Sequence, residues 1–374
     1  MFSFKKFFSG AVALVLTLSI TACGEDTIYA ASYGDTEIPA GVYINMQSSA
    51  VTEATDKMSE EDVAAGVDLL DATIDGLPAE TWIDNRAVEL MKEYAAVEEK
   101  FAELGLTYTN NADGVALGML EQMWAYYADA LTEMGISKDS YQKVLLNTVK
   151  REEIFRYYYG EGGEKAIPEA DIKAHLLEEN ALINYIPIEL KDGAGNFLKD
   201  DADKKARMDM ALEYVSRAED GVDFDALLKE YNDYQADLVA AATPAAETTT
   251  EEETPAENPE DELLPSNETV ITREGATPST TVAEKVFEKQ DASPMTDGAE
   301  EIFVVEDAGG EMYYVVKLMD LFSQDGYYDD NMFNVMDELK GEEFDETVKL
   351  WAADLKDFTV NEKAVKRYKV KNLM

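Results

Sequence analysis

The sequence of 374 residues contains one cysteine, one histidine and few cations, with 32 Lys and Arg residues against 78 Asp and Glu residues. An intrachain disulfide needs two cysteines, structural zinc sites need several Cys or His ligands, and a Ser-His-Asp triad needs a histidine beside its nucleophile. The sequence therefore argues against each of these sites, and we expect no metal and no cofactor. The formal net charge of −46 repels phosphate backbones, so we also expect no nucleic-acid partner.

The sequence nevertheless has enough apolar residues to fold. Hydrophobic residues make up 46% of the chain and aromatic residues 10%, so the acidity indicates a soluble surface and not a disordered chain. The length is typical of two or three domains.

The first 22 residues have the order of a signal peptide, because two lysines precede an apolar run from Phe7 to Ile20 and small residues follow it. The run is shorter than the roughly 20 residues that a membrane-spanning helix needs, and we predict no transmembrane span. The end of the run, Ile20-Thr21-Ala22-Cys23, resembles the lipobox of bacterial lipoproteins. That resemblance implies a lipid on Cys23 and an extracytoplasmic protein anchored to the cell membrane. The alternative is an unmodified thiol in a secreted protein.

Apolar residues recur at helical spacing through most of the first half of the chain. Pro39 and Pro78 lie where a helix can begin without losing a hydrogen bond, and Gly135 lies where a helix can end. The spacing predicts helices over residues 39–58, 78–101, 112–134, 137–159 and 169–179.

The pattern changes after Pro168, where strands join the helices. Residues 181–190 alternate as a strand does, and residues 301–306 and 312–318 flank Asp307-Ala308-Gly309-Gly310 as a hairpin. We predict further helices over residues 201–219, 223–231, 281–287 and 331–358. The fold class is therefore α+β and mostly α.

Residues 236–268 differ in composition from the rest, because Ala, Thr, Glu and Pro dominate and no aromatic residue occurs. Such a run buries too little apolar surface to offset the entropy lost on ordering. We predict a disordered acidic insert there.

This order of elements resembles the PrsA and SurA group of extracytoplasmic foldases. The motifs that carry the resemblance are Gly34-Asp35-Thr36-Glu37-Ile38-Pro39, the run from Ala218 to Tyr231, and Tyr313-Tyr314-Val315-Val316-Lys317. The resemblance implies a helical chaperone domain formed by both ends of the chain, with a small parvulin-like α/β domain inserted. It assigns residues 23–180 to the SurA-N-like helical region, residues 181–322 to the parvulin-like domain, and residues 323–374 to a helix that returns to the chaperone domain.

The sequence departs from the family at the residues that matter for isomerase activity. Active parvulin domains commonly place one histidine in the first strand and another in the last, and here the matching positions hold Tyr185 and Tyr314. The only histidine, His175, precedes the first strand, and we interpret it as a solvated or helix-packing residue. Tyrosine hydroxyls could keep the hydrogen bonding between the strands, so we infer a degenerate isomerase domain with no confident catalytic residue.

Other residue groups are open to two interpretations. Tryptophan, methionine and tyrosine side chains in the helices could form an apolar cradle for varied polypeptides, or they could be core. These residues are Trp82, Met119, Met123, Trp124, Tyr126, Tyr127 and Trp351. The acidic groups at 200–203 and 325–330 follow no known calcium-ligand spacing, so we interpret them as solvated surface.

The resemblance implies a membrane-anchored chaperone or foldase that binds unfolded or newly secreted polypeptides, and we expect no efficient prolyl isomerase activity. The first alternative is an active parvulin-type peptidyl-prolyl cis-trans isomerase, in which an apolar substrate pocket around Tyr185, Phe287 and Tyr314 twists the X-Pro bond. The uncatalysed barrier of about 18 to 20 kcal/mol could fall there by distortion and desolvation alone. The second alternative is a non-enzymatic surface lipoprotein that binds one dedicated partner.

Overall fold

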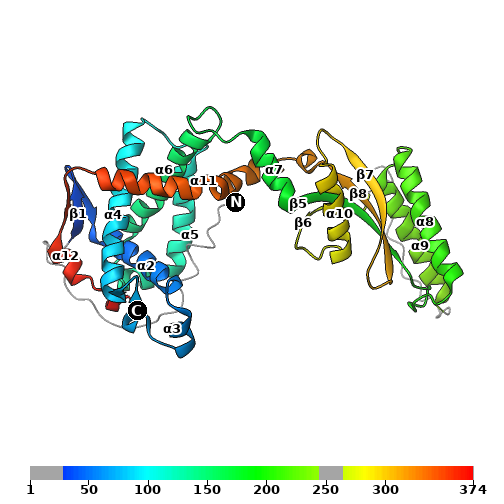
Figure 1. Ribbon diagram of the computed structural model, residues 1–374, viewed down its shortest axis with the longest axis horizontal. Coiled ribbons are helices and arrows are strands. Elements are labelled where there is room, and N and C mark those ends of the chain that lie inside the picture. The colour runs from blue at the N-terminus through cyan, green and yellow to red at the C-terminus, as the bar shows by residue number, and fades with distance from the viewer. Residues whose placement is uncertain (1–27, 244–263, 374) are drawn as a thin grey trace, which may run out of the picture. The chain divides into compact units, whose positions relative to one another are not determined.

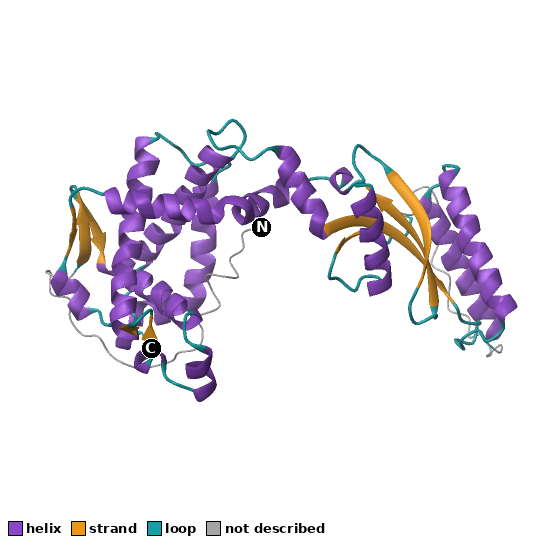
Figure 2. Cartoon of the chain, in the orientation of Figure 1, coloured by secondary structure: helices purple, strands orange, loops and turns teal. Residues whose placement is uncertain are grey.

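The computed structural model describes residues 28–243 and 264–373 (Figure 1). The chain divides into two units, of which the first comprises residues 1–168 and 336–374 and the second comprises residues 169–335. Helices dominate the first unit, whereas the second contains a four-stranded sheet (Figure 2). The predicted fold class is confirmed, because both ends of the chain build a mostly helical unit into which an α+β unit is inserted. Cys23 and the predicted signal peptide lie outside the described residues.

The first unit is built around two helices, α2 (Ala40–Asp56) and α4 (Ala79–Glu103), which pack against each other. Their buried faces share one core, to which α2 contributes Val42 and Tyr43 and α4 contributes Ile83 and Met91. The long helices around this pair are α5 (Ala112–Glu133), α6 (Lys138–Tyr159) and α11 (Tyr327–Asp354). The shorter elements are α3 (Glu60–Ala65), η2 (Leu69–Asp71), β3 (Thr73–Ile74), β4 (Leu77–Pro78), α12 (Glu362–Arg367) and η4 (Val370–Asn372).

A small antiparallel sheet joins the two ends of the chain. Strand β1 (Tyr29–Tyr33) lies between β2 (Thr36–Pro39) and β9 (Phe358–Val360). Gln47 adds a buried polar link, because its Nε2 lies 2.8 Å from the Asp84 carboxylate and 2.8 Å from the Tyr368 carbonyl oxygen. The C-terminal segment is thereby tied to both α2 and α4.

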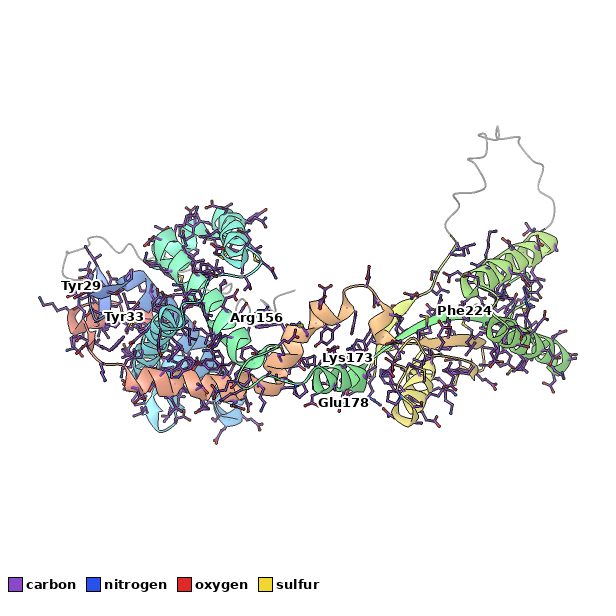
Figure 3. The ribbon with its side chains drawn as sticks, turned by 90° about the horizontal axis from the view of Figure 1, so that it is seen from above. Tyr29, Tyr33, Arg156, Lys173, Glu178 and Phe224 are labelled. Carbon is purple, nitrogen blue, oxygen red and sulfur yellow. The ribbon has the colours of Figure 1, made fainter. Side chains whose placement is uncertain are left out.

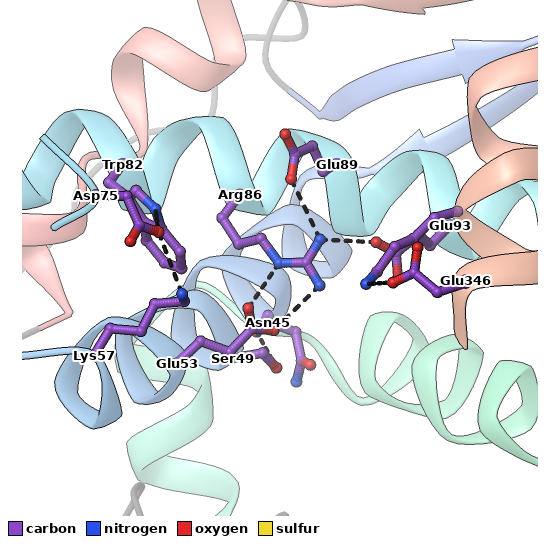
Figure 4. Close-up of polar contacts among 11 residues, drawn as sticks. Asn45, Ser49, Glu53, Lys57, Asp75, Trp82, Arg86, Glu89, Glu93 and Glu346 are labelled. Atoms are coloured by element: carbon purple, nitrogen blue, oxygen red, sulfur yellow. Dashed lines mark hydrogen bonds and ion pairs between the residues drawn. The ribbon is translucent and has the colours of Figure 1, made fainter. Parts of the chain in front are cut away.

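An ion-pair cluster on the α2–α4 surface adds to the apolar contact (Figure 4). The Arg86 guanidinium of α4 donates to Glu53 of α2 at 2.7 Å and to Glu93 of its own helix at 2.7 Å. The side chains of Arg86 and Glu93 are each only 17% exposed, so water screens this pair less than a surface pair.

Local chemistry sets how α6 meets its neighbours. The Ser137 hydroxyl caps the helix by accepting a hydrogen bond from the Ser140 N–H at 3.1 Å. Gly41 of α2 lies directly against this turn, where a Cβ atom would fall 2.6 Å from the Ser140 Oγ. Glycine is therefore required for the close approach of α2 to α6.

The second unit contains an antiparallel sheet in the order β6-β5-β8-β7. Its strands are β5 (Asn180–Glu189), β6 (Thr269–Thr272), β7 (Glu300–Glu306) and β8 (Met312–Met319). Its helices are α7 (Glu169–Glu179), α8 (Asp201–Glu219), α9 (Phe224–Ala242) and α10 (Thr280–Ala292), with a short η3 (Leu321–Ser323). Phe224 lies at the first residue of α9 (Figure 3).

Strand periodicity gives this sheet two apolar faces. Ile183, Tyr314 and Val316 share one cluster with residues of α10. The alternate residues Ile186 and Val315 share another cluster with residues of α8 and α9. Helices therefore cover both faces of the sheet, and its edge strands are β6 and β7.

The structure corrects the predicted start of the insert at residue 236. Residues 236–242 continue α9, which we predicted to end at Tyr231, and residues 264–268 precede β6. The apolar and alanine-rich spacing up to Ala242 sustains the helix although the local composition is poor in aromatic residues. Residues 244–263, which the prediction also covers, lie outside the described residues.

The units meet in the chain at 168/169 and 335/336, whereas the sequence-based boundaries lie at 180/181 and 322/323. The difference arises from helix α7 and the first residues of α11. The ammonium of Lys173 in α7 lies over the rings of Phe322 and Tyr328, and the Gln290 side chain donates to the Leu177 carbonyl. These contacts place both segments with the sheet.

Among the residues that the structure describes, none of the helices combines the length and the hydropathy of a membrane-spanning segment.

Candidate apolar binding surfaces

The three residues proposed from the sequence as a substrate pocket lie together in the second unit. Tyr185 of β5 and Tyr314 of β8 have ring centroids 6.0 Å apart in an edge-to-face arrangement, and Phe287 of α10 belongs to the same apolar cluster. The strands align Tyr185 with Val316 and Pro187 with Tyr314, so the two tyrosines occupy neighbouring positions on one face of the sheet.

The three residues differ in how far they are buried. Phe287 is 2% exposed and Tyr314 is 7% exposed, whereas Tyr185 is half-buried. Burial raises the pKa of the Tyr314 hydroxyl, and the charge of Asp307 raises it further. The two rings meet through their edges and faces, and neither hydroxyl donates to the other in the described structure, so the expected hydroxyl bridge between the strands is not found. This arrangement is that of a packed sheet–helix core.

Cations cover part of the outer rim of this cluster. The guanidinium of Arg273 lies 4.4 Å from the Phe287 ring centroid and also pairs with Asp291 at 2.7 Å. The Lys289 ammonium lies 4.6 Å from the Phe303 ring centroid. Both cations stabilise aromatic rings from outside the core.

The tryptophans of the proposed cradle lie in three different helices. Trp82 of α4 donates through Nε1 to Asp75 at 3.0 Å, with Lys57 over its ring (Figure 4). Trp351 of α11 packs against Tyr158 and Phe344. Trp124 of α5 is half-buried. In the described chain no ring contact joins the three tryptophans, so they do not form one aromatic cluster.

Helix α5 exposes much of its apolar surface. Of its 22 residues only Ala116 and Leu120 are buried, whereas Tyr126 is 85% exposed, Val115 50% and Met119 39%. Val115, Met119 and Tyr126 follow one another at intervals of four and seven residues, which places them on one face of the helix. We call these three residues the α5 stripe, and half-buried Met123 lies on the same face.

Helix α6 supports the other side of α5. The two helices pack together, and Lys138 at the start of α6 pairs with Glu121 of α5 at 2.6 Å. Gly135 connects them with a φ of +89°, a conformation that favours glycine. Asp129 and Glu133 are exposed one and two turns beyond Tyr126, so the stripe ends in negative charge.

Asp200 of the acidic groups and the histidine each have a local partner. No group of three or more His, Cys, Asp or Glu side chains could hold a metal ion in the part of the chain that the structure describes. Asp200 caps α8 by accepting from the Ala202 N–H at 2.8 Å. His175 lies in α7 with its Nδ1 3.7 Å from the Glu178 carboxylate.

The solved structures that this chain resembles include two of the foldase protein PrsA. The Lactococcus lactis protein aligns over 91% of this chain and 99% of its own, with 12% identity and a TM-score of 0.31. The Streptococcus pneumoniae protein aligns over 79% of this chain and 95% of its own, with 12% identity and the same TM-score. No family model and no curated protein matches the sequence. Both structures belong to the group of foldases that the sequence resembles. At a TM-score of 0.31 this similarity does not indicate a function.

The sequence indicates Met119 and Tyr126 as members of an apolar cradle but not Val115, and it does not distinguish the exposed members of the set from the buried ones. A signal that could single out α5 in the sequence is its low charge, because the helix carries only four charged residues, Asp113, Glu121, Asp129 and Glu133. Helical spacing predicted α5, but it did not show that one apolar face of this helix lacks a cover.

Proposed function

We propose that the protein is a chaperone or foldase that holds unfolded polypeptides on α5. The observation that carries the proposal is the α5 stripe, in which three large apolar side chains lie exposed on one helix face. Exposed apolar patches on otherwise polar proteins mark binding sites for other macromolecules. A methionine and a tyrosine suit varied partners, since methionine is flexible and tyrosine combines an apolar ring with a polar tip.

Binding on such a surface is expected to be weak and tolerant of sequence. Burial of apolar area contributes roughly 25 cal/mol per Å², and the few side chains of the stripe offer a modest area. The net charge of −46 keeps a complex with an aggregation-prone chain in solution and favours partners that carry positive charge.

The finer features of the proposal come from the sequence. We propose that Cys23 carries a lipid that anchors the protein outside the cytoplasm, on the strength of its position after Ile20-Thr21-Ala22. Exchange of Cys23→Ala should move the protein from the membrane fraction to the soluble fraction. A variant that stays firmly membrane-bound would overturn the anchor.

The holding function is tested by the aggregation of several unrelated unfolded proteins with a stoichiometric amount of the purified chain. The double variant Met119→Gln with Tyr126→Gln should lose most of the suppression, with an unchanged melting temperature. The matched control is Leu350→Gln, since Leu350 is 66% exposed on α11 but is not a member of the stripe. Equal suppression by the double variant and the parent would contradict the proposal.

The same preparation tests the isomerase alternative. Refolding of a proline-limited protein in the presence of catalytic amounts of the chain should not accelerate. Acceleration that disappears in Tyr314→Ala would instead make the second unit an enzyme.

A further inference from the structure

The β7 strand leaves one edge of the second sheet open. In the order β6-β5-β8-β7, β7 pairs with β8 over seven consecutive positions, from Glu300 opposite Met319 to Glu306 opposite Tyr313, without a bulge. No strand in the described chain pairs with its other side. The opposite edge strand, β6, has only four residues.

The register identifies which backbone groups of β7 point away from the sheet. Asp307 donates its N–H to the Met312 carbonyl at 3.0 Å, so this pair is hydrogen-bonded between β7 and β8. Antiparallel strands alternate between hydrogen-bonded and non-hydrogen-bonded pairs. The N–H and C=O groups of Ile302, Val304 and Glu306 therefore point outward.

Beyond the end of β6, the outward backbone groups of β5 have side-chain partners. There the outward N–H of Glu189 donates to the Tyr231 hydroxyl at 2.7 Å, and the Tyr185 carbonyl accepts from Asn267 Nδ2 at 2.9 Å. At the outward position between them, Pro187 has no N–H to satisfy. Side chains and a proline close this edge of β5, whereas no corresponding partner meets the outward groups of β7 in the described residues.

The composition of β7 leaves its middle free of charge. Glu300 pairs with Lys317 at 2.7 Å, and Glu301 pairs with Lys289. The four residues that follow are Ile302, Phe303, Val304 and Val305. Edge strands are commonly protected by charges, prolines or bulges along their length, and this segment has none of these.

We propose that β7 binds an extended segment of another polypeptide as an added antiparallel or parallel strand. Main-chain hydrogen bonds to Ile302, Val304 and Glu306 would supply the binding, so the surface accepts many sequences. The exposed carboxylate of Glu306 favours a segment with Lys or Arg at its end. This surface is separate from the α5 stripe and would bind by backbone pairing instead of apolar contact.

Charge argues against a second copy of this chain as the occupant. The antiparallel register that pairs β7 with itself over its whole length would set Glu300 of each copy opposite Glu306 of the other, and like charges directly opposite are destabilising. Each chain also carries a net charge of −46, which adds to the repulsion.

The test uses the full chain and the seven-residue peptide Lys-Val-Thr-Val-Thr-Val-Lys, which places a lysine opposite Glu306 in either direction. Amide hydrogen exchange, followed by NMR, should slow roughly tenfold at Ile302, Val304 and Glu306 and remain unchanged at Phe303. The same peptide methylated on alternate backbone nitrogens should have no effect. The peptide with Glu in place of Lys should bind more weakly.

A pair of variants separates backbone pairing from side-chain contact. Val304→Pro removes an outward N–H without removing a hydrogen bond to β8, and it should abolish peptide binding. Val304→Ala loses more of the side chain but keeps the N–H, and it should bind as the parent does. The methylated peptide keeps the proposal testable on the parent chain if the proline variant does not fold.

Three results would overturn the proposal. The first is that the peptide slows amide exchange nowhere in β7. The second is that the peptide slows amide exchange only in α5. The third is that the chain without peptide forms a dimer in which amide exchange at β7 is already slow. Because α5 variants leave β7 unchanged, loss of peptide binding in Met119→Gln with Tyr126→Gln would also contradict a separate surface.

Discussion

Helices α4 and α5 lie in the same unit and have similar lengths, but they are used in opposite ways. The 25 residues of α4 include ten charged residues, and eight of its residues are buried. The 22 residues of α5 include four charged residues, and two of its residues are buried. The less charged helix is the more exposed one. Composition therefore does not decide burial here, and the apolar surface of α5 calls for an explanation in function.

The largest expected difference between the helices is the response to loss of a methionine side chain. Met91 of α4 is fully buried, and Met91→Ala should lower the free energy of unfolding by about 2 to 5 kcal/mol, because it leaves a cavity in the core. Met119 of α5 is 39% exposed, and Met119→Ala should change that free energy by no more than about 0.5 kcal/mol. Urea unfolding followed by circular dichroism measures both. A large loss in Met119→Ala would mean that the α5 stripe is covered in the folded chain.

The next difference concerns ion pairs. Arg86→Gln removes a hydrogen bond to Glu53 of α2 and another to Glu93 within α4, and it should cost about 1.5 to 3 kcal/mol. Lys138→Gln removes the pair between α6 and the 69% exposed Glu121 of α5 and should cost less than about 1 kcal/mol. Thermal unfolding of both variants at low and high salt checks this order. Equal losses would indicate that α5 is held as firmly as α4.

A smaller effect is expected in α6, which packs against both helices. Burial raises the pKa of Glu152 to about 7, opposed by Arg156 and reinforced by Glu153 and Asp337. With a folded pKa above the unfolded value of about 4.3, the folded state binds the proton more tightly, so this group makes stability fall as pH rises from about 4 to 7. Glu152→Gln should therefore be more stable than the parent at pH 8 by about 1 to 2 kcal/mol.

The gain in Glu152→Gln should shrink toward pH 5, where the parent carboxyl is protonated in the folded state. Urea unfolding at pH 5 and pH 8 provides the comparison. A gain that is the same at both pH values would assign the effect to packing and not to charge.

The sequence predicted the long helices of both units because apolar spacing is a local property, but it missed the six-residue helices α3 and α12. Tyr185, Phe287 and Tyr314 pack in one cluster, and their part in substrate binding stays a prediction. The sequence also missed the length of α9, because composition over 236–242 outweighed helical spacing in the prediction.

The α5 stripe and the outer edge of β7 were harder to predict, because both depend on which residues the rest of the fold leaves uncovered. The periodicity around Tyr126 is the same for a core face and an exposed face, and only the packing of the other helices distinguishes them. The outward groups of Ile302 and Val304 follow from the register of β7 on β8, which pairs segments on either side of a turn and leaves one edge unpaired. Strand order across a sheet is a non-local property.

The central claim is that unfolded polypeptides bind on the α5 stripe, and photo-crosslinking tests it most directly. A photoreactive phenylalanine analogue replaces Tyr126 in one sample and Leu350 in another, two exposed apolar positions of the first unit. Illumination with an unfolded test protein should give a crosslinked product from position 126 and little or none from position 350. Equal yields at the two positions, or a product from position 350 alone, would contradict the account.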